Sequence, residues 1–218
     1  MTQLDDRVRR GLEAQLRELR RRTAGGERRI GWKVALNDPR VQGALEIGRP
    51  VIGFLASGTE VRSGDAHSLA GTTMPAVEPE IAVHMGADGG IEGLGPALEV
   101  IDVDLPFEDL ERILAGNVFH RAVVLGAATA GLSTVAGLTA RFGHEREEHS
   151  IDVTSAAMDP AEAVALFSGY LEAIGESLQR GDVIIAGSMM RALPAAKGGR
   201  FELDVDRLGA VALELRPA

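Results

Sequence analysis

The spacing of apolar residues constrains the fold of this chain more than any other feature of its sequence. Apolar residues recur at steps of three and four over residues 4–22 and over Asp159–Gln179, which predicts two amphipathic helices. A shorter helix is predicted to open at Pro106 and close at Gly116. Val77–Met85 and Leu98–Val103 are instead typical of short strands. Because no strand–helix–strand rhythm repeats, we expect an α+β fold with a mixed or antiparallel sheet, rolled upon itself.

The length and net charge of the chain limit its number of domains and its possible partners. At 218 residues we expect a single domain, 1–218, in which residues 1–26 form an N-terminal helical extension. The net charge of −9 argues against nucleic acid and anionic membrane as partners. The chain has no cysteine, no signal-peptide pattern in its first ten residues, and no apolar run near the roughly 20 residues that span a membrane. We therefore expect a cytoplasmic protein.

Two carboxylates flank a proline in "PAVEPEIAVHM", a stretch that is otherwise largely apolar. On a strand, Glu78 and Glu80 share one face while Ile81 and Val83 take the other, which is core. Two like charges at this spacing repel unless a cation lies between them, and hard oxygen ligands suit Mg²⁺ or Mn²⁺. Pro79 predicts an edge or a bulge, because proline donates no ladder hydrogen bond. Two harmless acids on a solvent-facing strand explain the pair as well.

Glu99 and Lys33 are two further charged residues within apolar runs. Glu99 lies in "PALEVIDV", where a buried carboxylate is costly unless it is paired, so it favours the metal hypothesis. Asp102 has a similar claim but would point to the opposite face of the strand. Lys33 lies in "IGWKVAL", and a lysine amine in an enclosed site can carry protons. The simpler alternative is a strand lysine that extends to water.

Five segments occur in order along the chain: "GWKVAL", "PVIGFL", "VEPEIAV", "PALEVID" and "GDVIIAGS". Together they resemble the family of 2-keto-4-pentenoate hydratases and 4-oxalocrotonate decarboxylases, within the wider fumarylacetoacetate hydrolase fold. The resemblance covers residues 30–215. It implies that this region is a catalytic mixed β-roll with flanking helices, assembled as a homo-oligomer at least dimeric.

The resemblance also implies a substrate and a site. The substrate would be a small 2-oxo acid or its dienol tautomer, chelated to one Mg²⁺ or Mn²⁺ that stabilises the enolate. The implied metal ligands are Glu78, Glu80 and Glu99, the proton carrier is Lys33, and the substrate-binding residues are Gly187, Ser188 and Asn117.

Three departures from the family pattern leave the reaction open. Val51 replaces an Asp that the family's hydratases use as an acid or base, whereas its decarboxylases are apolar there. Gly116 stands where the family has the Asp of an Asp–Asn pair, although Asn117 is kept. The link between Glu80 and Glu99 is also shorter than usual, by about one helix, which could move Glu99 away from the metal.

We therefore expect a hydratase-like, divalent-metal-dependent lyase acting on a 2-oxo acid or its 2-hydroxydienoate tautomer. Decarboxylation of a vinylogous 2-oxo acid is an alternative that Val51 favours. Hydrolysis of a C–C bond in an acylpyruvate is another, and His120 is then the catalytic base, although a helix-surface position explains that histidine equally well. A diverged family member that is not catalytic is the remaining alternative.

Overall fold

The computed structural model, which describes residues 4–105 and 108–217, contains two β-sheets with helices packed beside them. Its helices are α1 (Asp6–Ala24), α2 (Pro39–Ala44), the 3₁₀ turn η1 (Ser57–Thr59), α3 (Leu110–Ala115), α4 (Val153–Ala156) and α5 (Pro160–Ala173). Its strands are β1 (Arg29–Ala35), β2 (Val51–Ala56), β3 (Ala66–Ser68), β4 (Pro75–Met85), β5 (Ile91–Asp102), β6 (His120–Leu125), β7 (Thr129–Ala130), β8 (Thr139–His144), β9 (Glu147–Asp152), β10 (Val183–Ile185), β11 (Leu193–Pro194), β12 (Gly199–Val205) and β13 (Gly209–Arg216).

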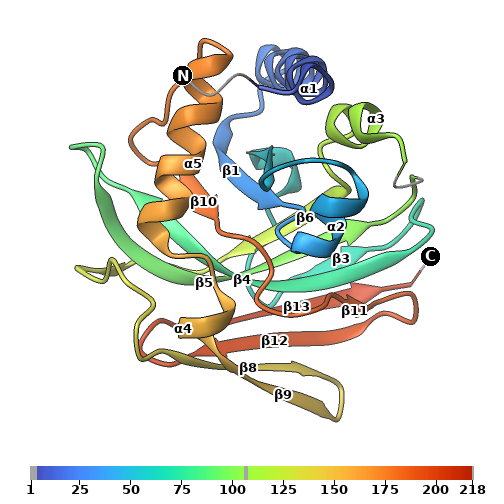
Figure 1. Ribbon diagram of the computed structural model, residues 1–218. Helices are drawn as coiled ribbons and strands as arrows, with labels where there is room; N and C mark the ends of the chain where they lie inside the picture. The colour runs from blue at the N-terminus through green and yellow to red at the C-terminus, as the bar shows by residue number, and fades with distance from the viewer. Residues whose placement is uncertain (1–3, 106–107, 218) are drawn as a thin grey trace.

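Both sheets mix parallel and antiparallel pairs. The first has the order β2-β1-β10-β4-β5-β6, with β11 and β7 pairing onto β4 and β5, and only its β1–β10 pair is parallel within the described residues. The second has the order β3-β13-β12-β8-β9, with β3 parallel to β13. Figure 1 shows the second sheet beneath the long β4–β5 hairpin, and α1 and α5 on the opposite side. The predicted α+β class with a mixed sheet is confirmed.

One face of the first sheet packs outward against the helices and the second sheet. Leu98 and Val100 of β5 belong to the same buried core as Phe201 of β12. Toward the other end of the sheet, the Trp32 ring of β1 lies 6.4 Å from the Phe167 ring of α5, measured between centroids. Burying side chains of this size contributes about 1.5–3 kcal/mol each, so this outer face carries most of the apolar stabilisation.

The opposite face of the first sheet lies inside a roll. Its buried apolar cluster draws on all six strands in the order and consists of Ile30, Leu55, Ala82, Ala97, Val123, Val183 and Ile185. Leu55 and Val123 come from the two outermost strands, β2 and β6, so the sheet must curl for both to join one cluster. The Val61 N–H, in the segment that follows β2 and η1, donates to the Val123 carbonyl of β6 at 2.8 Å. This bond links the two outer edges of the curled sheet. The predicted rolling of the sheet is confirmed.

Helix α1 packs into the main core rather than extending from it. Asp5 caps it by accepting a hydrogen bond from the Arg7 N–H at 2.7 Å. Leu12 and Leu16 on its apolar stripe are buried with the rest of the core, and the Gln15 amide donates to the Ile52 carbonyl of β2 at 3.1 Å. The helix therefore covers β2, one of the strands that form the roll.

Two other predicted helices differ in extent from the sequence pattern. Helix α5 ends at Ala173 rather than at Gln179, because Gly175 takes a left-handed backbone conformation with φ of +75° and ends the helical path. Helix α3 is capped by Asp109, whose side chain accepts from the Arg112 N–H at 3.1 Å. The predicted opening of α3 at Pro106 falls outside the described residues.

Strand β5 begins at Ile91, earlier than the predicted Leu98. Its glycines resemble strand breakers in the sequence, but each lies where another segment approaches closely. A Cβ at Gly93 would lie 2.5 Å from the Thr129 carbonyl oxygen, and one at Gly95 would lie 2.7 Å from that of Ala127. Glycine here permits the close approach of β7 and of the chain leading into it.

Candidate metal centre and active site

Three carboxylates meet on the inner face of the roll. Glu78 and Glu80 alternate along β4 and so share this face, and Glu99 of β5 is the direct register partner of Glu78. One oxygen from each carboxylate lies within 4.8 Å of the others. Glu80 and Glu99 are fully buried and Glu78 is half-buried. The short β4–β5 link therefore keeps Glu99 beside the other two acids, and the alternative of surface acids is wrong.

Pro79 lies between two short partner strands of β4. Strand β10 pairs with Ala82 and its neighbours, β11 pairs with Val77, and the Met189 N–H donates to the Pro79 carbonyl between them at 3.0 Å. In an antiparallel pair the N–H and C=O of one residue point to the same side, so the missing donor of Pro79 faces this loop. The expected local edge is present, but the expected bulge is not, because Pro79 stays in register with Leu98.

Two buried carboxylate oxygens have no hydrogen-bond partner among the residues that the structure describes. Glu80 accepts from the Gly187 N–H at 2.7 Å through Oε2, which leaves Oε1 without a partner. Glu99 accepts from Lys33 and His120 through Oε1, which leaves Oε2 without one. Unsatisfied buried charges are costly, and a divalent cation between hard oxygen ligands removes that cost. The donor set therefore fits Mg²⁺ or Mn²⁺.

The electrostatics of the three acids point the same way. Burial, followed by the charge on Glu99, raises the pKa of Glu78 to about 7. Burial, followed by the charges of Glu99 and Glu78, raises the pKa of Glu80 well above its ordinary value. Burial also opposes ionisation of Glu99, but the Lys33 charge and the His120 hydrogen bond outweigh it and lower its pKa. Without a cation, simultaneous ionisation of all three groups is therefore unfavourable.

Lys33 points into the roll beside Glu99. Its Nζ donates to the Glu99 carboxylate and to the Val118 carbonyl, the latter at 3.0 Å, and the side chain is 2% exposed. Gly53 of β2 lies opposite, and a Cβ there would be 2.9 Å from the Lys33 side chain. Lys33 is therefore held inside the protein, and the alternative in which its amine extends to water is wrong.

A cavity of about 160 Å³ opens beside Lys33 and Glu78. Strand β1 and the start of α2 form part of its wall. Most of the other lining side chains are apolar, namely Leu36, Val41, Ile101, Val103, Val118 and Phe119. The space suits a molecule of a few carbon atoms, with polar groups at one end and hydrocarbon around the rest.

Gly187 and Ser188 lie in the loop after β10, and only the serine lines the cavity. Gly187 has φ of +92°, and its N–H orients the Glu80 carboxylate, as described above. The Ser188 hydroxyl donates to the Met190 carbonyl at 2.6 Å, and the Asn37 amide donates to the Ser188 carbonyl at 3.2 Å. A substrate contact by Ser188 stays a prediction, whereas Gly187 acts on a metal-ligand candidate.

Asn117 is placed differently from the expectation of a substrate contact. Its side-chain amide is buried and exchanges two hydrogen bonds with the backbone of Phe54, at 2.8 and 2.9 Å. Asn117, Val118 and Phe119 all have positive φ, of 59°, 48° and 67°, an unusual run for residues that are not glycine. We correct the prediction of a substrate contact: Asn117 instead holds the turn that contains Val118, whose carbonyl accepts a hydrogen bond from Lys33.

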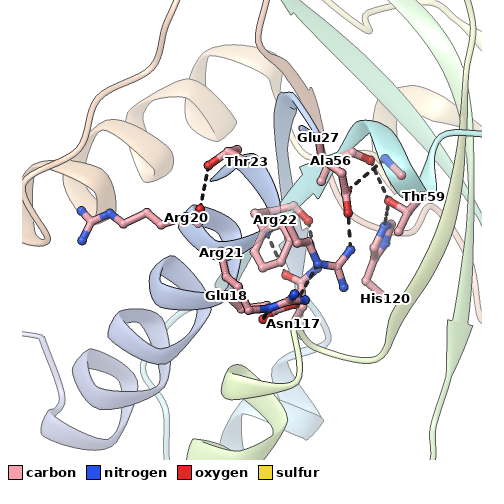
Figure 2. A network of polar contacts seen from close by, with 12 residues as sticks. Glu18, Arg20, Arg21, Arg22, Thr23, Glu27, Ala56, Thr59, Asn117 and His120 are labelled. Atoms are coloured by element: carbon pink, nitrogen blue, oxygen red, sulfur yellow. Dashed lines mark hydrogen bonds and ion pairs between the residues drawn. The ribbon is translucent and has the colours of Figure 1, made fainter. Parts of the chain in front are cut away.

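His120 lies behind Glu99 rather than on the cavity wall. Its Nδ1 is 2.7 Å from Glu99 Oε1, and its Nε2 is 2.9 Å from the Thr59 hydroxyl (Figure 2). Burial lowers its pKa, although the Glu99 carboxylate opposes this. Because the ring is buried at the start of β6, the helix-surface alternative is wrong. A role as a base for water stays a prediction, and it would require His120 to give up its contact with Glu99 or with Thr59.

Thr59 and Asn37 are two residues of the site that the sequence does not reveal. Both are small polar residues in loops or turns, and nothing in "SGTE" or "ALND" marks them as parts of a site. Their positions follow from the fold, which brings the turn η1 to His120 and the end of β1 to the loop after β10. Among the described residues, no helix combines the length and apolar character needed to cross a membrane.

Comparison with solved structures identifies the fold. The chain matches 4-oxalocrotonate decarboxylase from Pseudomonas putida G7, solved with calcium and acetate and with magnesium and adipate, with a TM-score of 0.83 at 22% identity over 94% of this chain and 85% of that one. It matches fumarylpyruvate hydrolase from Pseudomonas aeruginosa, solved with Mn²⁺ and pyruvate, with a TM-score of 0.63 at 17% identity over 88% and 90%. The fold is of the fumarylacetoacetate hydrolase type, as expected.

Sequence comparison then places the chain among relatives, although no family model matches it. It is 28% identical to 2-hydroxyhexa-2,4-dienoate hydratase from Comamonas testosteroni, covering 91% of this chain and 83% of the relative. It is 25% identical to 2-keto-4-pentenoate hydratase 1 from Dechloromonas aromatica (86% and 78%) and to 4-oxalocrotonate decarboxylase from Pseudomonas sp. (94% and 85%). The chain is a divergent relative of the 2-keto-4-pentenoate hydratases and 4-oxalocrotonate decarboxylases.

Proposed function

We propose that the protein is a hydratase-like lyase that depends on a divalent metal and acts on a small 2-oxo acid or its 2-hydroxydienoate tautomer. The observation that carries the proposal is the carboxylate triad beside a lysine and a small cavity, with two buried oxygens that have no partner among the described residues. Mg²⁺ or Mn²⁺ held by Glu78, Glu80 and Glu99 would supply the positive charge that stabilises negative charge developing on a 2-oxo carboxylate.

The side chains of this chain supply the remaining chemistry. Lys33 lines the cavity, and its Nζ is fixed by Glu99 and the Val118 carbonyl, so it can hold and return a proton at one place. The apolar wall excludes water from most of the substrate, which strengthens the electrostatic interactions at the polar end. Ser188 is placed to contact the substrate near that end.

The lining of the cavity favours hydration over decarboxylation. Among the described lining residues, Lys33 is the one cation, and it already bonds Glu99; Asp38 and Glu78 are acids. A second carboxylate on the substrate would be desolvated there without a partner, whereas a hydrocarbon tail fits. The lining therefore suits a monocarboxylic dienoate.

Decarboxylation stays the second candidate because of Val51. This residue is fully buried in β2 and has no group that moves a proton, so the acid or base expected of a family hydratase at this position is missing. Lys33 would have to serve alone. The hydrolase alternative needs a base, and His120 would act as one only by giving up its contact with Glu99 or with Thr59. Assembly as a homo-oligomer is part of the proposal and rests on the resemblance alone.

A turnover assay tests the proposal. The chelator-treated protein is mixed with a 2-hydroxy-2,4-dienoate or with a 2-oxo-3-enedioate, with and without Mg²⁺ or Mn²⁺, and the products are identified by mass. We expect the dienoate to gain one water in the presence of metal only. Loss of CO₂ from the enedioate would make decarboxylation the function, and no metal-dependent reaction with either would favour a non-catalytic protein.

A further inference from the structure

Thr59 and His120 form a hydrogen-bonded chain that ends on a carboxylate of the triad. The His120 ring joins the Thr59 hydroxyl, 2.9 Å from Nε2, to the Glu99 carboxylate, 2.7 Å from Nδ1. The side chains of His120 and Glu99 are 2% and 1% exposed, so water does not compete for either contact. Figure 2 shows Thr59 between the His120 ring and the Ala56 carbonyl, which the hydroxyl also contacts at 3.0 Å.

The chemistry of these groups sets which atoms carry protons. An ionised carboxylate only accepts hydrogen bonds, so His120 Nδ1 must carry the proton that faces Glu99. A hydroxyl has one proton, so Thr59 either donates it to an unprotonated Nε2, or accepts from a protonated Nε2 while donating to the Ala56 carbonyl. Without the hydroxyl, a buried ring nitrogen would have no partner, and the ring would lose one of its two orienting contacts.

The consequence falls on Glu99. Its Oε1 accepts hydrogen bonds from Lys33 and His120, and its Oε2 has no hydrogen-bond partner among the described residues. The carboxylate is therefore anchored through Oε1, and one oxygen of the same carboxylate lies within 4.8 Å of oxygens of Glu78 and Glu80. A group that orients a ligand in this way raises metal affinity without touching the metal.

We propose that Thr59 and His120 are positioning residues that hold Glu99 by Oε1, so that it presents Oε2 alone to the metal. The inference rests on the proposed function in one respect, since it takes the triad as the metal site. It assigns to Thr59 a role that no feature of the surrounding sequence indicates.

The turn that carries Thr59 is itself held in place. The Ser57 N–H donates to the Arg28 carbonyl at 2.9 Å, and the Arg28 N–H donates to the Ser57 hydroxyl at 2.9 Å. The Gly58 N–H donates to the Glu27 carboxylate at 3.1 Å, close to Arg22 at the end of α1 (Figure 2). These bonds fasten η1 to the α1–β1 junction and hold the Thr59 hydroxyl beside His120.

The test is a calorimetric titration of Mn²⁺ into chelator-stripped Thr59→Val and Thr59→Ser proteins. Valine keeps the shape and removes the hydroxyl, whereas serine keeps the hydroxyl. Thr72→Val is the matched control, because the Thr72 hydroxyl is also part-buried and bonds a carbonyl three residues back, that of Leu69, at 2.7 Å. We expect Thr59→Val to weaken Mn²⁺ binding by about tenfold or more, with Thr59→Ser and Thr72→Val within about twofold of wild type.

A second pair of variants addresses His120. Asparagine places an amide donor near the position of Nδ1, and leucine removes it. We expect His120→Leu to weaken Mn²⁺ binding by up to about a hundredfold and His120→Asn to recover part of the loss. Nitrogen-15 NMR of the wild-type imidazole should show Nδ1 protonated, and an unprotonated Nδ1 would overturn the inference.

The outcomes separate this inference from the proposed function. If wild-type protein and Thr72→Val bind Mn²⁺ while Thr59→Val and His120→Leu bind equally well, the positioning role is wrong and the metal site stands. If wild-type protein binds no Mn²⁺, the proposed function fails and the inference fails with it. Thermal melting of each metal-free variant shows whether a loss of binding is a loss of folding, and Thr59→Ser then decides the result.

Discussion

Two groups of acidic residues in this protein differ in everything but their charge. The inner acids are Glu78, Glu80 and Glu99. The outer acids lie on the exposed surface formed by β8, β9 and β12, and they are Glu145, Glu147, Glu148, Glu202 and Asp204. Asp204 pairs with Arg141 at 2.8 Å and Glu202 with Arg200 at 3.1 Å, with both carboxylate side chains about half exposed.

The comparison indicates that a metal site is distinguished by buried acids with too few cationic side chains beside them, and not by the number of acids that lie close together. The hollow among the outer acids measures about 490 Å³, larger than the cavity beside the inner acids at about 160 Å³. Its acids face arginines and water, so their charges are already screened. The inner acids share one lysine and retain two oxygens without a partner in the part of the chain that the structure describes, so of the two groups they are the one that needs a bound cation.

The largest effect should come from removing one inner carboxylate. Glu80→Gln keeps the shape of the side chain and removes its charge, so we expect Mn²⁺ affinity measured by calorimetry to fall by at least about a hundredfold. Glu202→Gln makes the same change among the outer acids and should leave the affinity unchanged. Equal affinity for wild type and Glu80→Gln would erase the distinction between the two groups.

Removing the lysine that serves the inner acids should separate catalysis from metal binding. We expect Lys33→Met to lower kcat by roughly 10²–10⁴-fold, the usual worth of a positioned proton carrier, while calorimetry still detects bound Mn²⁺. Lys197 is the only other lysine in the chain and is exposed, so Lys197→Met is the matched control. Unchanged turnover in Lys33→Met would remove the lysine from the mechanism.

The raised pKa values of Glu78 and Glu80 predict a pH-dependent metal affinity. Below a pH of about 7 the metal-free Glu78 carboxyl is protonated, and Glu80 also resists ionisation, so a cation must displace protons to bind. Mn²⁺ affinity should therefore rise with pH through this range, by about tenfold per pH unit for each proton displaced. Titrations at several pH values check this, and Glu78→Gln should show a shallower slope. An affinity independent of pH would contradict the account.

The smallest effect should come from the outer acids. Asp204→Asn breaks an exposed ion pair with Arg141, and we expect the free energy of unfolding in urea to change by less than about 1 kcal/mol. For comparison, Leu98→Ala in the buried core should cost about 2–5 kcal/mol. A decrease of several kcal/mol in the free energy of unfolding of Asp204→Asn would mean that the outer acids also contribute substantially to stability.

The inner acids could be predicted from local pattern because strand alternation is local. Period-two spacing places Glu78 and Glu80 on one face, and an apolar run around Glu99 marks a carboxylate that needs a partner. The same logic found Lys33. The five ordered segments supplied the roll and the remaining site residues as a resemblance.

The parts that escaped prediction depend on contacts between distant segments. The parallel pairing of Lys33 with Ile185 joins residues far apart in the chain, and no local spacing of residues predicts it. His120 follows a left-handed turn that the bonds between Asn117 and Phe54 help to hold. The run "GHEREEH" has the polar composition of a solvated loop, but most of it lies in the β8–β9 hairpin, because pairing between the two strands satisfies its backbone.

The central claim is that the inner acids hold a divalent metal that a 2-oxo acid chelates. The most direct measurement is a calorimetric titration of Mn²⁺ into chelator-stripped wild-type protein with and without oxalate, which imitates the planar enolate of such a substrate. The account predicts a single site whose affinity oxalate increases. Absence of binding under both conditions, or single-site binding that oxalate leaves unchanged, would contradict it.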